Sequence, residues 1–536
     1  MSFLFQTNLI STGDLKLIAP ELIITVTACI VLVMEVILPY KLSKWTAYFS
    51  LTGLALALVS LGAQFMSMGG TFKLDALQNL SAVDGFYGMI RIDGFAIVFK
   101  AIFLIASALA ILIAMRYLDI EREQHGEYYA LVLFATVGMM FLGCGYDLIS
   151  LYISLELMAV TFYVLVAFTK RQRRSNEAGM KYFLLGAFSS GILIYGMSLL
   201  YGVTGSTNLG EIGTGVGRIM STATAAGNSS SLKPMLLLGM IALAAGLFFK
   251  IAAVPFHMWA PDAYEGAPTS VTAFLSTGSK AASFALYARI FFVALAPMQI
   301  DWAPLLGIVA ALTIVVGNWA AITQENSKRL LAYSSISNAG YLLLGVIANN
   351  AYGNIGLVIY LFVYVLMNMG AFGVIISLRR RGIIGDNVDD MTGLAKKAPG
   401  MAAMMAIFML SLGGMPGTGG FMGKWYLLYG LFARAETDHK TWYYWLAAWA
   451  IINLVVSFFY YLRFIKVMYL GDRVADEQPL TMSPALRTAL VATLVGILFI
   501  GLYPQPLIVL AQKLFPAQIA APAPVPAKPA SPIEAP

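Results

Sequence analysis

Long apolar runs dominate this chain and limit its possible folds more than any other feature. Runs of about 20 apolar residues, the length that an α-helix needs to cross a bilayer, recur about fourteen times. Inside lipid only helices and closed barrels satisfy every backbone polar group. The sequence therefore predicts an all-α polytopic membrane protein of about fourteen transmembrane helices, at roughly 17–38, 46–68, 94–116, 128–145, 147–168, 178–203, 235–257, 269–297, 302–322, 329–349, 353–378, 400–433, 442–470 and 485–510.

The composition supports a lipid-facing surface. Charged residues make up 11% of the 536 residues and hydrophobic residues 59%, whereas soluble domains carry roughly 25% charged residues. So few charges cannot cover a water-facing surface. The opening residues lack a signal-peptide cleavage pattern, so the first span is expected to be retained.

The basic residues in the loops predict the orientation. When the loops are assigned alternately to two sides, one side receives about 19 lysines and arginines and the other about nine. The positive-inside rule makes the richer side cytoplasmic and places both termini on the periplasmic side. The net charge of +7 thus reflects membrane topology, and no nucleic-acid binding is expected.

The cysteines and histidines indicate no metal site or redox centre. Cys29 and Cys144 lie in apolar runs and form no C-x-x-C or metal-binding spacing. His125, His257 and His439 do not lie deep inside apolar runs, as the axial ligands of a membrane haem would. The chain is therefore expected to hold no cofactor of its own.

Four ionisable residues lie far from any predicted loop: Glu156, Lys250, Lys280 and Lys424. At 1.5 Å per residue, Lys250 and Lys280 lie roughly 20 and 17 Å from their helix starts, near the middle of the membrane. An ionised lysine at that depth costs about 2.5–3.5 kcal/mol. Burial favours the neutral amine and a nearby Glu favours the ammonium, so the four residues are candidates for a switchable proton path.

A structural role explains other charges as well as a functional one does. A single membrane lysine can extend to the interface or form a static pair. Lys181 lies about four residues into its run, beside a basic loop, so this interpretation suits it. Glu35 lies near the end of the first run and is interpreted as interfacial, while Asp147 is expected to cap a helix.

Two predicted spans contain helix-breaking residues. Pro255 follows Lys250 closely, and Pro416 with six glycines precedes Lys424 in SLGGMPGTGGFMGK. Proline removes a backbone donor and kinks a helix, and an ordinary kink is the simpler explanation. The two spans are the seventh and the twelfth, so they run in opposite directions. Interrupted spans at matching positions are typical of inverted repeats around a central path.

Four stretches resemble the antiporter-like subunits of respiratory complex I. They are DLISLYISLEL (147–157), KIAAVPFHMWAPDAYEGAPTSVTAFLSTGSK (250–280), KRLLAYSSISNAGY (328–341) and GGMPGTGGFMGKWYL (413–427). Within that family, the opening APELIITVTACIVLVMEV and the lysine at 424 resemble the subunit N branch of proton-translocating NADH:quinone oxidoreductase.

The resemblance implies a role for each candidate. Glu156 would be the charge partner of Lys250, Lys280 the central relay, Lys424 the group that exchanges protons with the outer side, and Lys181 an accessory lysine. Many relatives carry a histidine where this chain has Asn338. Because Asn does not titrate, the relay would need water or a polar group from the set Ser334, Ser337 and Tyr341.

The resemblance also implies an organisation of the chain. Three helices in 1–127 would precede two inverted five-helix repeats, at 128–300 and 301–475, each containing a broken helix. A last helix would lie in 476–515, before a disordered Pro/Ala-rich tail at 516–536. Residues 69–93 and 204–234 are expected to be external loops, the first with room for a short interfacial helix.

The implied setting is a bacterial inner membrane. There the chain would join the antiporter-like subunits M and L and the small subunits K, J, A and H, with NADH, FMN, iron–sulfur clusters and quinone on partner subunits. Two alternatives stay open from the residues: a subunit of a multi-subunit Na⁺/H⁺ antiporter, and a structural membrane scaffold with static ion pairs. The transported ion, H⁺ or Na⁺, is equally open.

Overall fold

The structure is a computed structural model that describes residues 11–39, 42–70, 82–121, 123, 125–225, 232–379, 385–471 and 482–514. Within these residues, twelve helices are long and apolar enough to cross a membrane. The predicted all-α polytopic class is therefore confirmed. The predicted Pro/Ala-rich tail at 516–536 lies outside the described residues.

The described residues form a series of α-helices along the chain. Their bounds, in chain order, are α1 (Thr12–Leu17), α2 (Ala19–Ile37), α3 (Trp45–Ser67), α4 (Gly94–Glu121), α5 (His125–Cys144), α6 (Leu148–Val166), α7 (Arg173–Thr204), α8 (Leu209–Ala225), α9 (Lys233–Ile251), α10 (Trp259–Gly266), α11 (Thr269–Phe274), α12 (Lys280–Arg289), α13 (Gln299–Ile322), α14 (Ser327–Ala348), α15 (Ala351–Leu378), α16 (Leu394–Lys397), α17 (Pro399–Gly413), α18 (Gly419–Asp438), α19 (Trp442–Leu470), α20 (Pro484–Leu502) and α21 (Gln505–Leu514).

Twelve of the predicted apolar runs correspond to one candidate span each, and the other two are divided. The run at 269–297 contains α11, the π-helical segment η4 (Leu275–Ser279), α12 and a second π-helical segment, η5 (Ile290–Ala294). The run at 400–433 contains α17 and most of α18, separated by residues 414–418. Single π-turns inside helices are frequent at functional sites.

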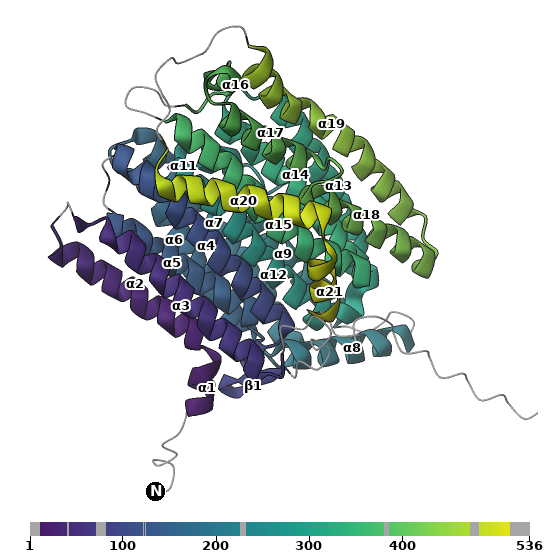
Figure 1. Cartoon of the computed structure of the whole chain (residues 1–536). Helices are drawn as coiled ribbons and strands as arrows, with labels where there is room; N and C mark the ends of the chain where they lie inside the picture. Colours follow the sequence, from purple (N-terminus) through teal and green to yellow (C-terminus); the bar gives the residue numbers. More distant parts are fainter. Residues whose placement is uncertain are drawn as a thin grey trace, which may run out of the picture.

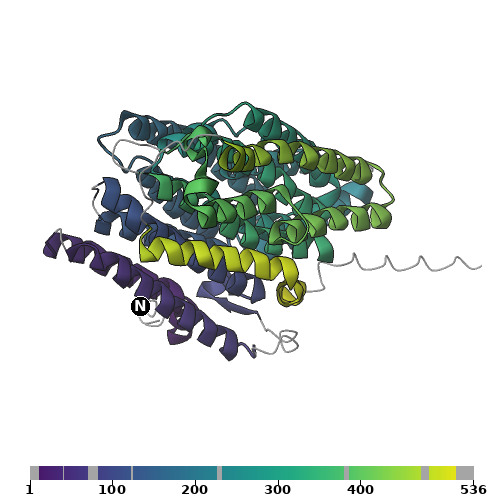
Figure 2. The same ribbon diagram turned by 45° about the horizontal axis from the view of Figure 1, so that its top comes forward.

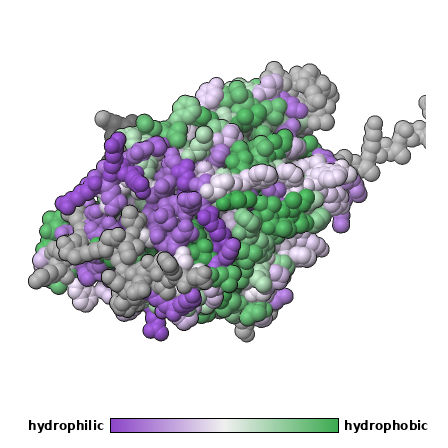
Figure 3. All heavy atoms as spheres, turned by 90° about the horizontal axis from the view of Figure 1, so that it is seen from above, coloured by the Kyte–Doolittle hydropathy of each residue, from purple (hydrophilic) through white to green (hydrophobic). Residues whose placement is uncertain are grey.

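The helices form one bundle whose two ends differ. Helix α1, strand β1 and α8 lie at one end, and α16 lies at the other (Figure 1). Helices α2 and α3 form an edge layer, and α20 lies along the side of the bundle (Figure 2). Hydrophilic residues gather on the face seen from the α16 end (Figure 3). Helices α14 and α15 are the most deeply buried spans, so the core of the bundle lies around them.

The loop predicted at 204–234 is wrong for much of its length, because residues 209–225 form α8. Three apolar side chains of α8, each about one helical turn from the next, are fully buried: Leu209, Ile212 and Val216. They give α8 an apolar face that packs against η5 and the short helical segment η6 (Ala296–Met298). The Gly, Ser and Thr content hid this pattern, because these residues weaken a helix signal.

The predicted outer loop at 69–93 contains a β-hairpin in its described part. Strand β1 (Val83–Gly85) pairs antiparallel with β2 (Ile90–Ile92), and Val83 lies opposite Ile92. A short 3-10 segment, η3 (Phe86–Gly88), joins the strands, so no interfacial α-helix occurs in 82–93. Arg91 hydrogen-bonds Asp84 at 2.6 Å and holds the pKa of that carboxyl below its ordinary value.

Two residues interpreted as structural have structural contacts. Asp147 caps α6, since its carboxylate accepts the Ile149 backbone N–H at 2.8 Å, and the cap prediction is confirmed. Glu35, near the end of α2, accepts the Ser43 hydroxyl at 2.6 Å and the Gly126 backbone N–H at 3.0 Å. It therefore joins α2, α5 and the turn before α3.

Candidate functional site: a row of buried lysines

Glu156 and Lys250 meet through a serine hydroxyl. Glu156 lies on α6 and Lys250 on α9, with Lys250 Nζ 4.0 Å from Glu156 Oε1. Ser190, on α7, donates to Glu156 Oε1 at 2.5 Å, and its oxygen lies 3.4 Å from Lys250 Nζ. The Lys250 side chain is 4% exposed and that of Glu156 28%. The charges are thus close, but a hydroxyl lies between them.

The end of α9 determines the position of Lys250. Helix α9 stops at Ile251, because Ala252 adopts a left-handed conformation with φ 57°. The Ala253 N–H bonds the Phe248 carbonyl at 2.8 Å, and the Trp259 indole N–H bonds the Phe249 carbonyl at 2.9 Å. Lys250 therefore lies in the last helical turn, where the backbone carbonyls favour a positive charge.

Pro255 lies in the turn at 252–258, between α9 and α10. A proline there has no backbone N–H to leave unsatisfied. The Val254 N–H is satisfied by the Thr313 hydroxyl of α13 at 3.0 Å. The interruption predicted near Lys250 is therefore a complete end of α9 followed by the short helix α10.

Lys280 begins α12, directly after the π-helical segment η4. Its side chain is buried, and Nζ donates to the Ser335 carbonyl of α14 at 2.5 Å. Within the described residues no carboxylate pairs with this ammonium, so a backbone dipole stabilises it instead.

Lys424 has the same kind of partner. It lies on α18, and its Nζ donates to the Leu412 carbonyl of α17 at 2.7 Å. Helix α17 ends at Gly413, so the Leu412 carbonyl is among those left without a helical partner. The Tyr341 ring lies 4.9 Å from Nζ and adds a cation–π contact. Again no carboxylate pairs with the ammonium in the part of the chain that the structure describes.

Pro416 lies in the turn at 414–418 that separates α17 from α18. Gly414 and Gly417 both have φ of +85°, a conformation that favours glycine. At Gly414 an added Cβ would also lie 3.2 Å from the Lys424 side chain. The glycine-rich sequence therefore gives both the turn and the space for the lysine.

Asn338 lies in a hydrogen-bonded network of α14, α15 and α19. It accepts the Tyr360 hydroxyl at 2.8 Å, and its amide nitrogen lies 3.4 Å from both Ser334 Oγ and Tyr461 Oη. Ser334 Oγ and Tyr461 Oη are hydrogen-bonded at 2.5 Å. The Tyr360 ring also lies 5.9 Å from Lys424 Nζ. Tyr360 therefore connects Asn338 to Lys424.

Tyr360 and Tyr461 were not predicted from the sequence as site residues, because tyrosines in apolar runs resemble ordinary core residues. The other two relay candidates near Asn338, Tyr341 and Ser337, have different surroundings. The Tyr341 hydroxyl donates to the Ala450 carbonyl at 2.8 Å. The Ser337 hydroxyl is buried without a hydrogen-bond partner among the described residues.

Lys181 contacts a different set of charges. Its side chain is 48% exposed and lies 2.9 Å from Glu177 and 3.1 Å from Asp262 of α10. Asp262 also binds Arg329 of α14 at 3.0 Å. Lys181 therefore belongs to a surface ion network that links α7, α10 and α14.

A further buried ion pair was not predicted from the sequence. Lys100 of α4 lies 2.6 Å from Glu21 of α2, and their side chains are 0% and 1% exposed. The Cys144 sulfur lies 3.9 Å from the same carboxylate. Both charges lie near the starts of their helices, where a membrane charge is unremarkable, so the available signal was weak.

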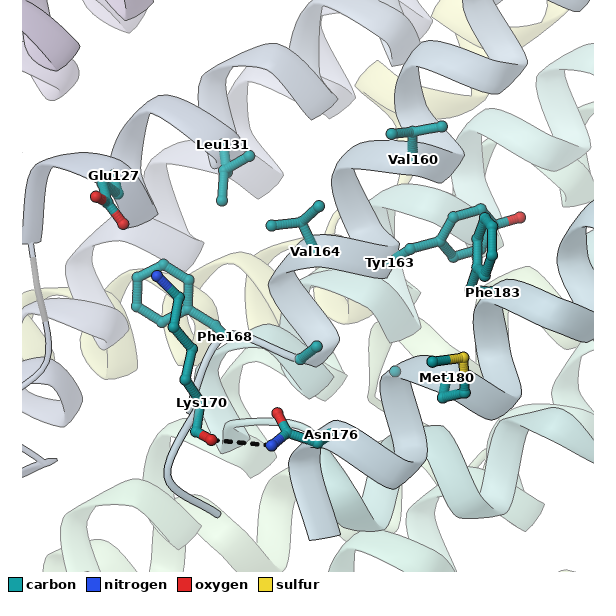
Figure 4. A pocket seen from close by; sticks show the side chains of 12 residues that line it. Glu127, Leu131, Val160, Tyr163, Val164, Phe168, Lys170, Asn176, Met180 and Phe183 are labelled. Carbon is teal, nitrogen blue, oxygen red and sulfur yellow. Dashed lines mark hydrogen bonds between the residues drawn. The ribbon is translucent and has the colours of Figure 1, made fainter. Parts of the chain in front are cut away.

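The outer surface of α5, α6 and α7 carries an open pocket of about 630 Å³ (Figure 4). Val160, Val164 and Met180 line its apolar part, and Lys170 and Asn176 lie at one end, with Asn176 donating to the Lys170 carbonyl at 2.9 Å. Four charged residues do not line this pocket: Glu156, Lys250, Lys280 and Lys424. The candidate site is the row formed by the partly exposed Glu156 and the buried Lys250, Lys280 and Lys424, hereafter the charged row.

A polytopic helical bundle with buried lysines beside interrupted helices defines a membrane-embedded ion translocator. Residues 145–448 match the family described as NADH:quinone oxidoreductase/Mrp antiporter, TM. The chain is 47% identical to NADH-quinone oxidoreductase subunit N 1 of Koribacter versatilis, over 93% of this chain and 94% of that one. It is 49% identical to subunit N 2 of Solibacter usitatus, over 82% and 85%.

A solved structure has the same fold at lower identity. A chain of respiratory complex I from Thermus thermophilus, solved with bound aureothin, superposes with a TM-score of 0.71 at 32% identity, over 92% of this chain and 99% of that one. This chain therefore belongs to the NADH-quinone oxidoreductase subunit N family, the proton-translocating, antiporter-like membrane subunits of respiratory complex I. The resemblance inferred from the four motifs is confirmed.

Proposed function

We propose that protons cross the membrane along the charged row, from Lys250 through Lys280 to Lys424. One observation carries the proposal: the ammonium groups of Lys280 and Lys424 are buried with backbone carbonyls as their closest polar partners. A buried ammonium paired with a carboxylate would leave a stranded negative charge when it lost its proton. An ammonium held by a carbonyl leaves a neutral amine beside a neutral group, so it can load and release protons.

In this proposal Glu156 controls the first step. When Glu156 lies close to Lys250, its negative charge favours the ammonium. When the two move apart, Lys250 loses that support and passes its proton towards Lys280. The Ser190 hydroxyl between them, 2.5 Å from the carboxylate and 3.4 Å from the amine, suits a pair that opens and closes. Lys181 has an accessory role through Asp262.

The relay from Lys280 to Lys424 follows one face of α14. Ser334, Asn338 and Tyr341 are spaced by four and three residues, so their side chains share a face of the helix. Ser335, beside Ser334, supplies the carbonyl for Lys280, and the Tyr341 ring contacts Lys424. Tyr360 and Asn338 take the place of the family's histidine, with hydroxyl and amide groups that hold water for proton transfer.

We also propose the arrangement in the membrane. The two divided spans would complete fourteen crossings, and 128–300 and 301–475 would be inverted repeats with their broken helices at Pro255 and Pro416. Residues 1–127 would precede them, and 476–515 would supply the last helix. The α16 end would face the cytoplasm of a bacterium, since the basic residues gather in its loops, with both termini in the periplasm.

The proposed partners are the antiporter-like subunits M and L, the small subunits K, J, A and H, and the lipid bilayer. NADH, FMN, iron–sulfur clusters and quinone would be bound by partner subunits. The surface of α6 supports a contact with another membrane subunit, because Ile153 and Val160 are more than half exposed around Glu156. A carboxylate that faces lipid is costly, so a protein partner would cover it.

Replacing Glu156 with Gln tests the proposed control step. The amide keeps the Ser190 contact but removes the charge that supports the Lys250 ammonium. We therefore expect proton pumping to fall by about a hundredfold or more, the scale of the loss of a proton-transfer group. The measurement is NADH-driven acidification of inverted membrane vesicles that contain the assembled complex.

The matched control is Glu211→Gln. Glu211 is an exposed acid on α8 whose carboxylate accepts the Ser206 hydroxyl, and this variant should pump at the wild-type rate. NADH oxidation with a water-soluble electron acceptor reports whether the complex has assembled. Wild-type pumping by the Glu156 variant in an assembled complex would refute the control step.

A further inference from the structure

Lys328 is a buried lysine that the charged row does not include. Its run in the sequence was predicted to begin after it, which would leave Lys328 in a loop, but α14 begins at Ser327. The residue is 3% exposed, and its Nζ donates to the Ala267 carbonyl at 3.1 Å. Ala267 lies just before α11, in the segment that leads to Lys280. A lysine at a helix start could reach water, so its burial needs an explanation.

Lys328 belongs to an ion cluster that consists of Lys328, Asp386, Arg379 and Glu121. Lys328 Nζ lies 3.4 Å from Asp386 Oδ2, and Arg379 Nη1 lies 3.6 Å from Asp386 Oδ1. Arg379 also binds Glu121 of α4 at 2.6 Å. Asp386 therefore shares its charge between two cations, which makes it a weaker partner for Lys328 than it would be in an exclusive pair.

The backbone holds Asp386 beside α14. The Ser327 N–H bonds the Asp386 carbonyl at 2.6 Å, and the Val388 N–H bonds the Glu325 carbonyl at 3.0 Å. These two bonds attach the segment at 386–388 to the start of α14. Lys328 therefore faces the carboxylate in a defined position, although 58 residues separate the two in the chain.

A polar stripe connects Lys328 to Lys280. Lys328, Ala332 and Ser335 are spaced by four and three residues and share one face of α14. Ser335 supplies the carbonyl that binds Lys280, roughly 10 Å along the helix from Lys328. Ala332, between them, is small. The Tyr264 hydroxyl of α10 lies 3.4 Å from Ser335 Oγ beside the stripe.

Two buried hydroxyls near the start of the stripe support a hydrated path. Thr269 Oγ1 and Ser327 Oγ have no hydrogen-bond partner among the described residues, and both residues are at most 1% exposed. Buried hydroxyls in proteins are almost always hydrogen-bonded. These two groups therefore provide binding positions for water beside Lys328, at the start of the stripe.

We propose that Lys328 is the proton-uptake residue that feeds Lys280 from the α16 end, and that Asp386 retains the proton until it moves along the polar stripe. The proposal deepens the proposed function and rests on it. It assigns to the KRLLAYSSISNAGY stretch a chemical role at its first residue, in addition to the packing role of its apolar positions.

The test compares three variants in the assembled complex, in inverted vesicles energised with NADH. Lys328→Arg keeps a positive charge beside Asp386 and Ala267 but does not release a proton. Lys328→Met removes the charge as well. We expect both to lower pumping by about a hundredfold, at the lower end of the range for the loss of a proton-transfer group. Lys466→Met, an exposed lysine on α19, is the matched control and should pump normally.

Asp386→Asn adds a readout that a purely structural pair would not move. The charged groups that face Lys328 are Asp386, Arg379 and Glu265. Without the Asp386 charge, Lys328 holds its proton less firmly, so the alkaline decline of pumping should begin at a lower pH than in the wild type. Because this variant keeps Lys328 and its Ala267 contact, it remains informative if the Lys328 variants fail to assemble.

Two results would overturn the inference. Wild-type pumping by Lys328→Arg would mean that the positive charge, not proton release, is what matters at this position. An unchanged alkaline limb in Asp386→Asn would remove the retention step. Lys280→Met is the reference: if it too pumped normally, the proposed function itself would fail, whereas its loss of pumping beside a normal Lys328→Arg would reject the uptake residue alone.

Discussion

Replacing Lys280 with Met should reduce NADH-driven proton pumping by about a hundredfold or more, since groups that transfer protons contribute about 10²–10⁴-fold. Methionine has nearly the length of lysine and suits a buried apolar site, so little repacking is expected. The change removes the amine that bonds the Ser335 carbonyl at 2.5 Å. In the described residues, no other titratable side chain donates a hydrogen bond to the Ser335 carbonyl.

The measurement is acidification of inverted vesicles, with electron transfer from NADH followed in the same preparation. Lys280→Arg separates charge from proton exchange, because arginine keeps the positive charge and does not deprotonate. It should pump as poorly as the Met variant. Full pumping by either variant, in a complex that oxidises NADH normally, would favour the structural scaffold over the proton relay.

The second large effect is on stability. Lys100→Met should destabilise the protein by about 3–5 kcal/mol, because it leaves a buried carboxylate without its cation. Glu21 is 1% exposed, and its Oε2 has no hydrogen-bond partner among the described residues even with Lys100 present. The helices α2 and α4 would then meet around an unpaired charge.

The double variant Glu21→Leu with Lys100→Met should recover most of that loss, since well-packed apolar residues often replace a buried ion pair without cost. Thermal unfolding of the purified complex in detergent, together with the amount of this subunit that it retains, would measure both effects. Lys44→Met is the control, because the exposed Lys44–Asp119 pair should be worth less than about 1 kcal/mol. A double variant as unstable as the single one would show that the pair itself stabilises the fold.

Much of the fold could be predicted because lipid imposes strict rules. Length and hydropathy located the runs of all twelve candidate spans, and Asp147 was predicted as a helix cap from its position alone. The prediction at 204–234 failed, because the Gly, Ser and Thr content of α8 obscured the apolar face that packs against η5. The apolar runs that contain Lys280 and Lys424 were predicted. Hydropathy did not predict the π-helical segment before Lys280 or the two separate helices α17 and α18 around Lys424.

The sequence by itself determined that this is a polytopic membrane protein and to which family the chain belongs. It could do so because hydropathy is local and because the motifs are contiguous. Only the tertiary structure decided that Ser190 lies between Glu156 and Lys250, that carbonyls hold Lys280 and Lys424, and that Lys328 and Lys100 are buried. Those contacts join residues that are far apart in the chain, and only the packing of helices brings them within bonding distance.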